Sequence, residues 1–178
     1  MLKDGFSTSD ELIKRLKALD DDVAHQAPSV TKARITIVGG GALVMLNSFS
    51  RITFDIDVMD IFSPELLPIM EKYDINARSN AFCDCVAYNY EDRLVKLDID
   101  TKIIDFYLMS LEDIVIMKLF SDRGKDLQDI RDSKIVNNLD WDLLEQIISS
   151  GEANVYFNEL RYKHFLEHYE EYKKECHK

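Results

Sequence analysis

The sequence predicts an α/β (α+β) fold in which a small mixed sheet is flanked by helices and followed by a helical C-terminal third. Two observations predict it. Within residues 1–108, short apolar and β-branched runs bounded by turn residues alternate with segments of helical periodicity. Beyond that point the apolar residues recur at helical spacing. We therefore expect a core with an N-terminal helix in residues 1–108 and a helical region in residues 109–178, packed together as one compact unit.

Each element follows from one of these two periodicities. An N-terminal helix is predicted over residues 8–25, because candidate N-caps (Ser7, Thr8, Ser9) precede acidic residues and apolar residues at helical spacing. Strands are expected at residues 34–38, 53–59, 81–88, 93–99 and 102–108. Helices are expected at residues 42–49, from Ser63 with Pro64 at the first helical position, and at 110–121, 125–136, 140–149 and 152–175.

Composition describes an ordinary globular protein with an acidic surface. Of 178 residues 46% are hydrophobic and 31% charged, and 33 acidic residues against 22 basic ones give a net charge of −11. This charge disfavours nonspecific binding to nucleic acid, although a local basic patch or a bridging metal would still allow an RNA substrate. Three cysteines (Cys83, Cys85, Cys176) indicate reduced thiols rather than a zinc site.

The N-terminus and the apolar runs predict where the protein is found. No apolar run approaches the roughly 20 residues that span a bilayer. The opening “MLKDGFSTSDELIK” lacks the apolar stretch of a secretory signal. We therefore expect a cytoplasmic protein with no membrane partner.

A glycine triplet, Gly39–Gly41, lies between a predicted strand and a predicted helix. Such a turn can present backbone N–H groups to phosphate, and glycines let the main chain approach closely. The pattern is neither the dinucleotide-binding G-x-G-x-x-G nor a P-loop. Taken alone, a glycine triplet after a strand is more often a tight turn than a binding site.

Two aspartates follow the triplet in the stretch “SRITFDIDVMD”. Asp55 comes 14 residues after Gly41, which is enough for one helix and a return into a neighbouring strand. Alternation along that strand would place Asp55 and Asp57 on one face. Magnesium is normally bound by one or two carboxylates together with substrate phosphates. The alternative is an exposed, solvated Asp-x-Asp, but the upstream glycines favour phosphate chemistry.

These residues carry a family resemblance. “IVGGGALVML” followed by “SRITFDIDV” resembles the opening of the nucleotidyltransferase superfamily, in which Gly-Gly or Gly-Ser precedes Asp-x-Asp. The sequence of this motif is most similar to that of the bacterial group related to abortive-infection and toxin–antitoxin nucleotidyltransferases (AbiEii-like). A second stretch, “SLEDIVIMKLFSDRGKDLQDI”, resembles their downstream motif. Together the two stretches cover residues 35–131, about half of the chain.

The resemblance implies roles for the matching positions. Asp55 and Asp57 would be catalytic and would ligate two magnesium ions. The residues implied to hold the nucleoside triphosphate, ATP or another NTP, are Gly39, Gly40, Gly41, Arg51, Thr53, Lys118 and Arg123. In the downstream motif, which also includes Lys125, Lys118 and Asp126 would be catalytic residues, and Lys118 would supply counter-charge to phosphate. Asp126 would contact the nucleotide, the metal region or Arg123, and the alternative is a solvated, salt-bridged helix face.

The superfamily usually has a third carboxylate, acting as a metal ligand or as the base for the incoming hydroxyl. We expect Asp84 in this role, because it is an acid in an otherwise apolar run that follows the helical crossover. Asp98 and Asp100 are rivals, since “KLDID” repeats the Asp-x-Asp pattern, and Asp105 is a weaker one. The structural alternative for Asp84 is a strand-end aspartate paired with a lysine or arginine.

The resemblance therefore implies a magnesium-dependent enzyme that transfers a nucleotide from an NTP to a hydroxyl acceptor. The acceptor would be an RNA 3′ end, a partner protein or a small molecule such as an aminoglycoside, and an antitoxin would be a partner if the chain is a toxin. Two other classes of function stay open. One is a catalytically inactive nucleotide-binding or interaction module of the same fold, and the weaker one is a structural helical partner.

Overall fold

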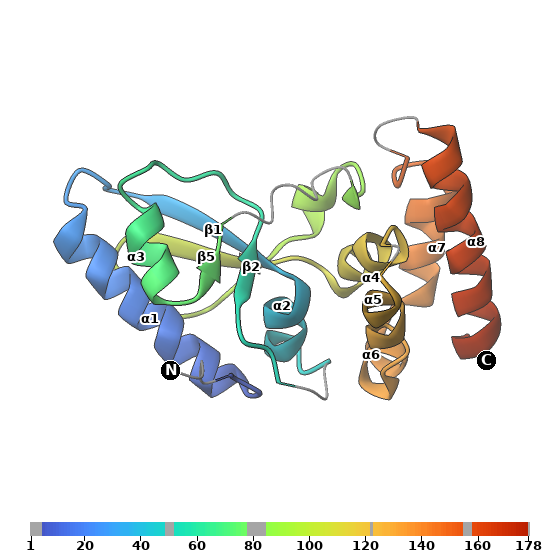
Figure 1. The fold of residues 1–178 in the computed structure, drawn as a ribbon, viewed down its shortest axis with the longest axis horizontal. Coiled ribbons are helices and arrows are strands. Elements are labelled where there is room, and N and C mark those ends of the chain that lie inside the picture. Colours follow the sequence, from blue (N-terminus) through green and yellow to red (C-terminus); the bar gives the residue numbers. More distant parts are fainter. Residues whose placement is uncertain (1–4, 49–51, 78–84, 122, 155–157, 178) are drawn as a thin grey trace. The chain divides into compact units, whose positions relative to one another are not determined.

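The computed structural model describes residues 5–48, 52–77, 85–121, 123–154 and 158–177 (Figure 1). Contacts divide the chain into two units. The first comprises Met1–Ala81 and Leu94–Met109, and the second comprises Phe82–Arg93 and Ser110–Lys178. Two expected site residues, Arg51 and Asp84, lie outside the described residues.

Within the described residues of the first unit, a five-stranded mixed sheet is formed, which confirms the predicted fold class. Its order is β3-β2-β1-β5-β4, where β1 is Ala33–Val38, β2 Ile56–Val58, β3 Ile75–Asn76, β4 Val95–Lys96 and β5 Ile104–Leu108. β1 is parallel to β5, and β2 is parallel to β3. The β1–β2 and β4–β5 pairs are antiparallel.

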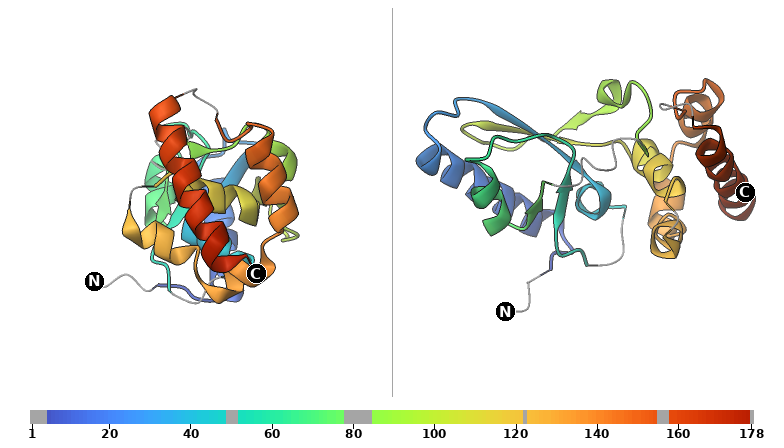
Figure 2. Two further views of the ribbon diagram at one scale, coloured as in Figure 1. Left: turned by 90° about the vertical axis from the view of Figure 1, so that its right-hand side faces the viewer. Right: turned by 45° about the horizontal axis from the view of Figure 1, so that its top comes forward.

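Three helices of this unit, α1 (Ser9–Gln26), α2 (Gly39–Met45) and α3 (Leu67–Lys72), lie on one side of the sheet (Figures 1 and 2). α1 packs against both of the others. Of the candidate caps it uses Thr8, which forms a capping box with Glu11. The buried Asp20 carboxylate accepts backbone N–H bonds of 2.6–2.9 Å from Lys102, Ile103 and Ile104, so it holds α1 to the start of β5.

α3 begins later than predicted. Ser63 and Pro64 were expected to start this helix, but residues 64–66 form a turn and α3 begins at Leu67. The reason is Pro68, which lacks an N–H and would clash with the preceding turn in the interior of a longer helix. At the start of α3 the proline costs little, because the first N–H groups have no partner within the helix.

Several predicted strands are shorter in the structure or do not form. β2 has three residues and β4 has two, and both were expected to have seven. The described part of the expected strand at 81–88, residues 85–88, is turn and 3₁₀ structure. Cys85, Val86 and Ala87 are buried there. Burial explains their apolar character without a strand, because a short apolar run does not reveal its own periodicity.

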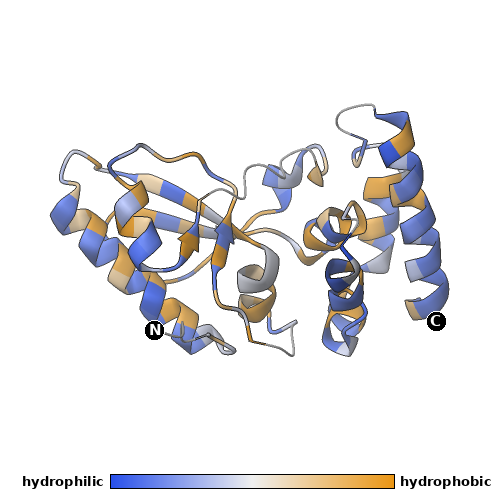
Figure 3. Ribbon diagram, viewed as in Figure 1, coloured by the Kyte–Doolittle hydropathy of each residue, from blue (hydrophilic) through white to orange (hydrophobic). Residues whose placement is uncertain are grey.

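The second unit is helical. Its elements are η2 (Tyr90–Arg93), α4 (Leu111–Leu119), α5 (Gly124–Asp129), α6 (Ser133–Asn138), α7 (Trp141–Ser149) and α8 (Glu159–Cys176). α4 is buried over nearly its whole length and contacts α5, α7 and α8, whereas α8 is largely polar (Figure 3). Phe165 of α8 stacks on Phe120 with ring centroids 4.2 Å apart. None of the helices in the described ranges is both long and apolar enough to cross a membrane.

Candidate functional site

The end of β1 brings the glycine triplet beside Asp57. Val38 pairs with Asp57 in the antiparallel β1–β2 register, and α2 begins at the next residue, Gly39. Gly39 has a φ of +59°, a backbone conformation that glycine adopts readily. A Cβ added to Gly39 would lie 2.9 Å from Asp57 Oδ2. The carboxylate therefore occupies the space that a side chain at position 39 would need.

The other two glycines meet different neighbours. A Cβ on Gly40 would lie 2.9 Å from Thr53 Oγ1. A Cβ on Gly41 would lie 3.3 Å from Ile37 Cγ2 and 3.6 Å from Ile56 Cγ2, in the buried core. Gly39 and Gly40 thus allow close approach to polar groups, whereas Gly41 allows helix–sheet packing.

Asp57 is fixed by its neighbour on the next strand. Asp57 and Asn76 are partners in the parallel β2–β3 register, so their side chains lie on the same face. Asn76 Nδ2 donates a hydrogen bond of 2.8 Å to Asp57 Oδ1. The two oxygens of the partly buried carboxylate therefore differ, because Oδ1 accepts from Asn76 while Oδ2 lies beside Gly39.

The first aspartate has a different setting. Asp55 is exposed and lies in a bend before β2. The prediction that both aspartates belong to one regular strand is therefore wrong. Thr53 Oγ1 donates to the backbone carbonyl of Asp55 at 3.3 Å. Thr53 is itself held by an antiparallel bridge to Phe6, with backbone hydrogen bonds of 2.8 and 3.1 Å.

The rival third carboxylates lie toward the other end of the sheet. Leu108 pairs with Ile37 near the glycine turn, but the chain leaves β4 after Lys96 toward the start of β5, and this segment carries Asp98 and Asp100. Asp105 forms ion pairs of 2.7 Å with Lys96 and 3.4 Å with Lys32. The hydrogen bond from Lys96 lowers the pKa of Asp105.

A complete metal cluster is not formed by the described part of the chain. Among these residues, no three or more His, Cys, Asp or Glu side chains are placed to hold a metal ion together. Two carboxylates with substrate phosphates nevertheless suffice for magnesium. Asp57 Oδ2 is an oxygen ligand of the kind that magnesium takes, and it lies beside the main chain of the glycine turn, 2.9 Å from the position of a Gly39 Cβ.

Lys118, Arg123 and Asp126 meet one another within the second unit. Lys118 Nζ donates to Asp126 at 2.8 Å and to Asp129 at 2.9 Å, and all three residues are buried. Asp126 also accepts from Ser121 at 2.7 Å and from Arg123 Nε at 2.6 Å. Burial raises the pKa of Asp126, but hydrogen bonds from Lys118 and Ser121 outweigh it and keep this pKa below the ordinary value.

The Lys118 ammonium is therefore engaged by carboxylates, whereas the Arg123 side chain is 71% exposed. Lys125, the other basic residue of this motif, is also exposed. The roles of Lys118, Arg123 and Asp126 toward a nucleotide stay predictions.

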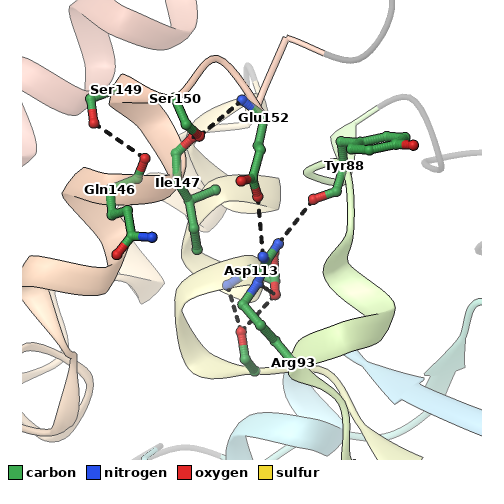
Figure 4. Close-up of polar contacts among 9 residues, drawn as sticks. Tyr88, Arg93, Asp113, Gln146, Ile147, Ser149, Ser150 and Glu152 are labelled. Carbon is green, nitrogen blue, oxygen red and sulfur yellow. Dashed lines mark hydrogen bonds and ion pairs between the residues drawn. The ribbon is translucent and has the colours of Figure 1, made fainter.

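The remaining part of the downstream motif holds the fold together. Asp113 is fully buried, accepts from Ser110 Oγ at 2.7 Å, and forms a bidentate pair of 2.8 and 2.9 Å with Arg93. Arg93 also reaches Glu152 and the carbonyl of Tyr88, each at 3.2 Å (Figure 4). Bidentate arginine–carboxylate pairs of this kind are strong and directional. The motif “SLED” thus joins α4 to η2 and to the turn after α7.

Sequence reasoning missed two residues of the site, Asn76 and Phe6. Asn76 ends the short run “DIN”, where no strand was predicted from the sequence. Phe6 is 2% exposed although it lies near the N-terminus. Each contacts the site through pairing with a segment distant in sequence, Asn76 with Asp57 and Phe6 with Thr53. Local periodicity does not predict such pairing.

The chain matches a protein-family model. A family model described as “Nucleotidyltransferase of unknown function (DUF6036)” matches residues 14–177, a range that includes Gly39, Asp57 and the downstream motif. No curated protein and no solved structure matched the chain.

Proposed function

Because the chain belongs to the DUF6036 family of nucleotidyltransferases of unknown function, we propose that it is a magnesium-dependent enzyme that transfers a nucleoside monophosphate from an NTP to a hydroxyl acceptor. The family suggests nucleotidyl transfer in general. One observation carries the more specific proposal. Asp57 Oδ2 lies 2.9 Å from the position that a Cβ of Gly39 would take, so a cation on this oxygen and a phosphate at the glycine turn would be neighbours.

The residues of the first unit would have separate roles in the reaction. Asp55 and Asp57 would hold magnesium, which when bound neutralises phosphate charge and makes the α-phosphorus easier to attack. Gly39 and Gly40 would admit the triphosphate close to the main chain. The acceptor oxygen then bonds to the α-phosphorus as the bond to the bridging oxygen breaks, and pyrophosphate leaves. Positioning and charge neutralisation supply most of the rate.

Three further roles belong to the proposal. Asp84 would take the acceptor proton or serve as the third metal ligand. Arg123 would offer its exposed guanidinium to phosphate, and Lys118 would add positive charge. The supporting observation for Arg123 is its hydrogen bond to Asp126, which already orders the guanidinium. Phosphate binding would therefore cost little further side-chain entropy.

The acceptor and the biological role are proposed from the resemblance to abortive-infection and toxin–antitoxin nucleotidyltransferases. A protein hydroxyl or a small molecule is favoured over a long RNA, because the net charge of −11 repels phosphates. If the chain is a toxin, its expression should arrest bacterial growth and Asp57→Ala should relieve the arrest. Growth unaffected by the unmodified chain would argue against the toxin role and leave the transfer reaction to be judged separately.

A nucleotide-binding module without turnover is the second candidate. It rests on the third carboxylate, which the described residues do not supply and for which the expected residue, Asp84, lies outside them. Such a module would bind magnesium and an NTP at the same turn, but it would not carry out the transfer.

A pair of measurements on the full chain separates these functions. In a melting experiment, magnesium with an NTP at 100 times its Kd should stabilise the protein by about 2.7 kcal/mol, which shifts Tm by several degrees. With an α-³²P-labelled NTP, label should pass to an acceptor in a cell extract, and Asp57→Asn should reduce this at least about 100-fold. Asp21→Asn is the matched control, because Asp21 is an exposed carboxylate on α1 paired with Lys102.

If the unmodified chain is stabilised by magnesium and the NTP but transfers no label, the result would contradict the enzyme and support the binding module. Neither stabilisation nor transfer would overturn both functions. Equal activity of Asp57→Asn and Asp21→Asn would overturn the assignment of the site.

A further inference from the structure

We propose that Asn76 is a positioning residue that orients the carboxylate of Asp57 toward the metal and the glycine turn. This inference rests on the proposed function, because it concerns the same site. It adds a residue that neither the glycine motif nor the Asp-x-Asp motif contains.

The geometry assigns the two oxygens of Asp57 to different tasks. Asn76 Nδ2 lies 2.8 Å from Oδ1, whereas Oδ2 lies 2.9 Å from the position of a Gly39 Cβ. An ionised carboxylate can accept but not donate, so Asn76 must present its NH₂ group to it. This bond restricts rotation of the carboxylate, and Oδ2 stays directed toward the turn.

An amide suits this position better than a charged donor. A lysine or arginine at position 76 would neutralise Asp57 and compete with a divalent cation for the same oxygens. A neutral NH₂ group fixes the carboxylate and leaves its negative charge for the metal. Hydrogen-bond partners that orient metal ligands in this way typically change metal affinity 10–100-fold when they are removed.

The backbone around Asn76 is itself held firmly. Ile75 is 4% exposed and pairs with Ile56 in the β2–β3 register. The backbone N–H of Ile56 donates to the carbonyl of Asp74 at 2.9 Å. The side chain of Asp74 forms an ion pair of 2.7 Å with Arg15 of α1. The donor therefore lies on a strand that is paired with β2 rather than in a loop, as a positioning role requires.

The test measures the binding of Mn²⁺, a spectroscopic substitute for Mg²⁺, to the full chain with a nonhydrolysable NTP. Asn76→Leu keeps the shape of the side chain but removes the donor, and we expect Mn²⁺ affinity to fall 10–100-fold. Asn76→His should recover most of the affinity, because imidazole Nδ1–H lies the same number of bonds from Cα as the amide nitrogen. At saturating metal the transfer rate of Asn76→Leu should recover, so the metal activation constant changes more than kcat.

Tyr73→Phe is the matched control. Tyr73 donates from its hydroxyl to the carboxylate of Asp22 at 2.7 Å in the same unit, away from the glycine turn. Its Mn²⁺ affinity should stay within twofold of that of the unmodified chain. Asn76→Ala serves as a second donor-free variant if Asn76→Leu does not fold.

Each outcome bears on a different claim. Unchanged Mn²⁺ affinity in a folded Asn76→Leu or Asn76→Ala protein would overturn the positioning role and leave the proposed function standing. An unmodified chain that binds neither Mn²⁺ nor the NTP would overturn both. An equal loss of Mn²⁺ affinity in Asn76→Leu and Tyr73→Phe would show that the loss does not depend on the hydrogen bond to Asp57, which also contradicts the inference.

Discussion

At the scale of single residues, the three positions of the glycine triplet meet different requirements. Gly39 is needed for a left-handed backbone and for the space taken by Asp57, and Gly40 is needed for the space taken by Thr53. Gly41 is buried against Ile37 and Ile56. The resemblance implied one common role for the three glycines, but their neighbours differ, so their substitutions should differ as well.

We predict that Gly39→Ala abolishes nucleotide binding whereas Gly41→Ala affects mainly stability. Alanine at position 39 would cost about 1–2 kcal/mol for its φ of +59° and would push Asp57 aside. Alanine at position 41 would require neighbouring methyl groups to move by a few tenths of an ångström, and overpacking of this kind typically costs about 1–3 kcal/mol. Urea denaturation and titration with an NTP and magnesium measure both effects.

The opposite pattern, with normal binding by Gly39→Ala and lost binding by a folded Gly41→Ala, would contradict this division. Folded variants that both bind normally would show that phosphate does not approach the turn.

At the scale of elements, local chemistry predicted α1, α4 and α7 better than the short strands, whereas the helix expected at 125–136 is divided into α5 and α6. α1 was predictable because its cap, first-turn acids and apolar stripe all lie within one segment. β1 and β5 were predictable because each is an apolar, β-branched or aromatic run that the sheet buries. The lengths of β2 and β4 depend on partners far away in sequence, and so do the contacts of Asp57 with Asn76 and of Thr53 with Phe6. Periodicity alone contains no information about those partners.

The junction between α4 and α5 gives a prediction about pH. A carboxyl whose pKa is lower in the folded than in the unfolded chain contributes stability above its unfolded pKa. This contribution is lost as the pH falls through the folded pKa. Asp126 is such a group, with an unfolded value near 3.8. Asp126→Asn should therefore reduce the free energy of unfolding by about 1.5–3 kcal/mol at neutral pH, and the difference should shrink below pH 3.8.

Denaturant unfolding of both proteins between pH 2.5 and 7 measures this difference. Asp92→Asn, an exposed carboxylate of the second unit, should change the free energy of unfolding by less than about 0.5 kcal/mol. A difference for Asp126→Asn that stays constant with pH would mean that the charge of Asp126 does not stabilise the fold.

At the scale of the whole molecule, acidity extends to both units. The first contains 11 basic and 15 acidic residues, and the second contains 11 basic and 18 acidic residues. Neither unit therefore supplies the excess of basic residues with which proteins usually bind long nucleic acids. A compact substrate such as a metal-bound triphosphate suits this charge better, because the metal neutralises phosphate charge locally.

The residues matching the family resemblance are distributed over both units, and this distribution leads to the last prediction. Gly39, Thr53 and Asp57 belong to the first unit, whereas Lys118 and Arg123 belong to the second. Hydrogen–deuterium exchange of the full chain, with and without magnesium and a nonhydrolysable NTP, should show slower exchange at residues 39–41, 53–57 and 75–76. If Lys118 and Arg123 also contact the nucleotide, residues 118–126 should be protected at the same ligand concentrations.

Protection confined to the first unit would remove these two residues from the binding site. Protection confined to the second unit would place the nucleotide away from the glycine turn and contradict the assignment of Asp57.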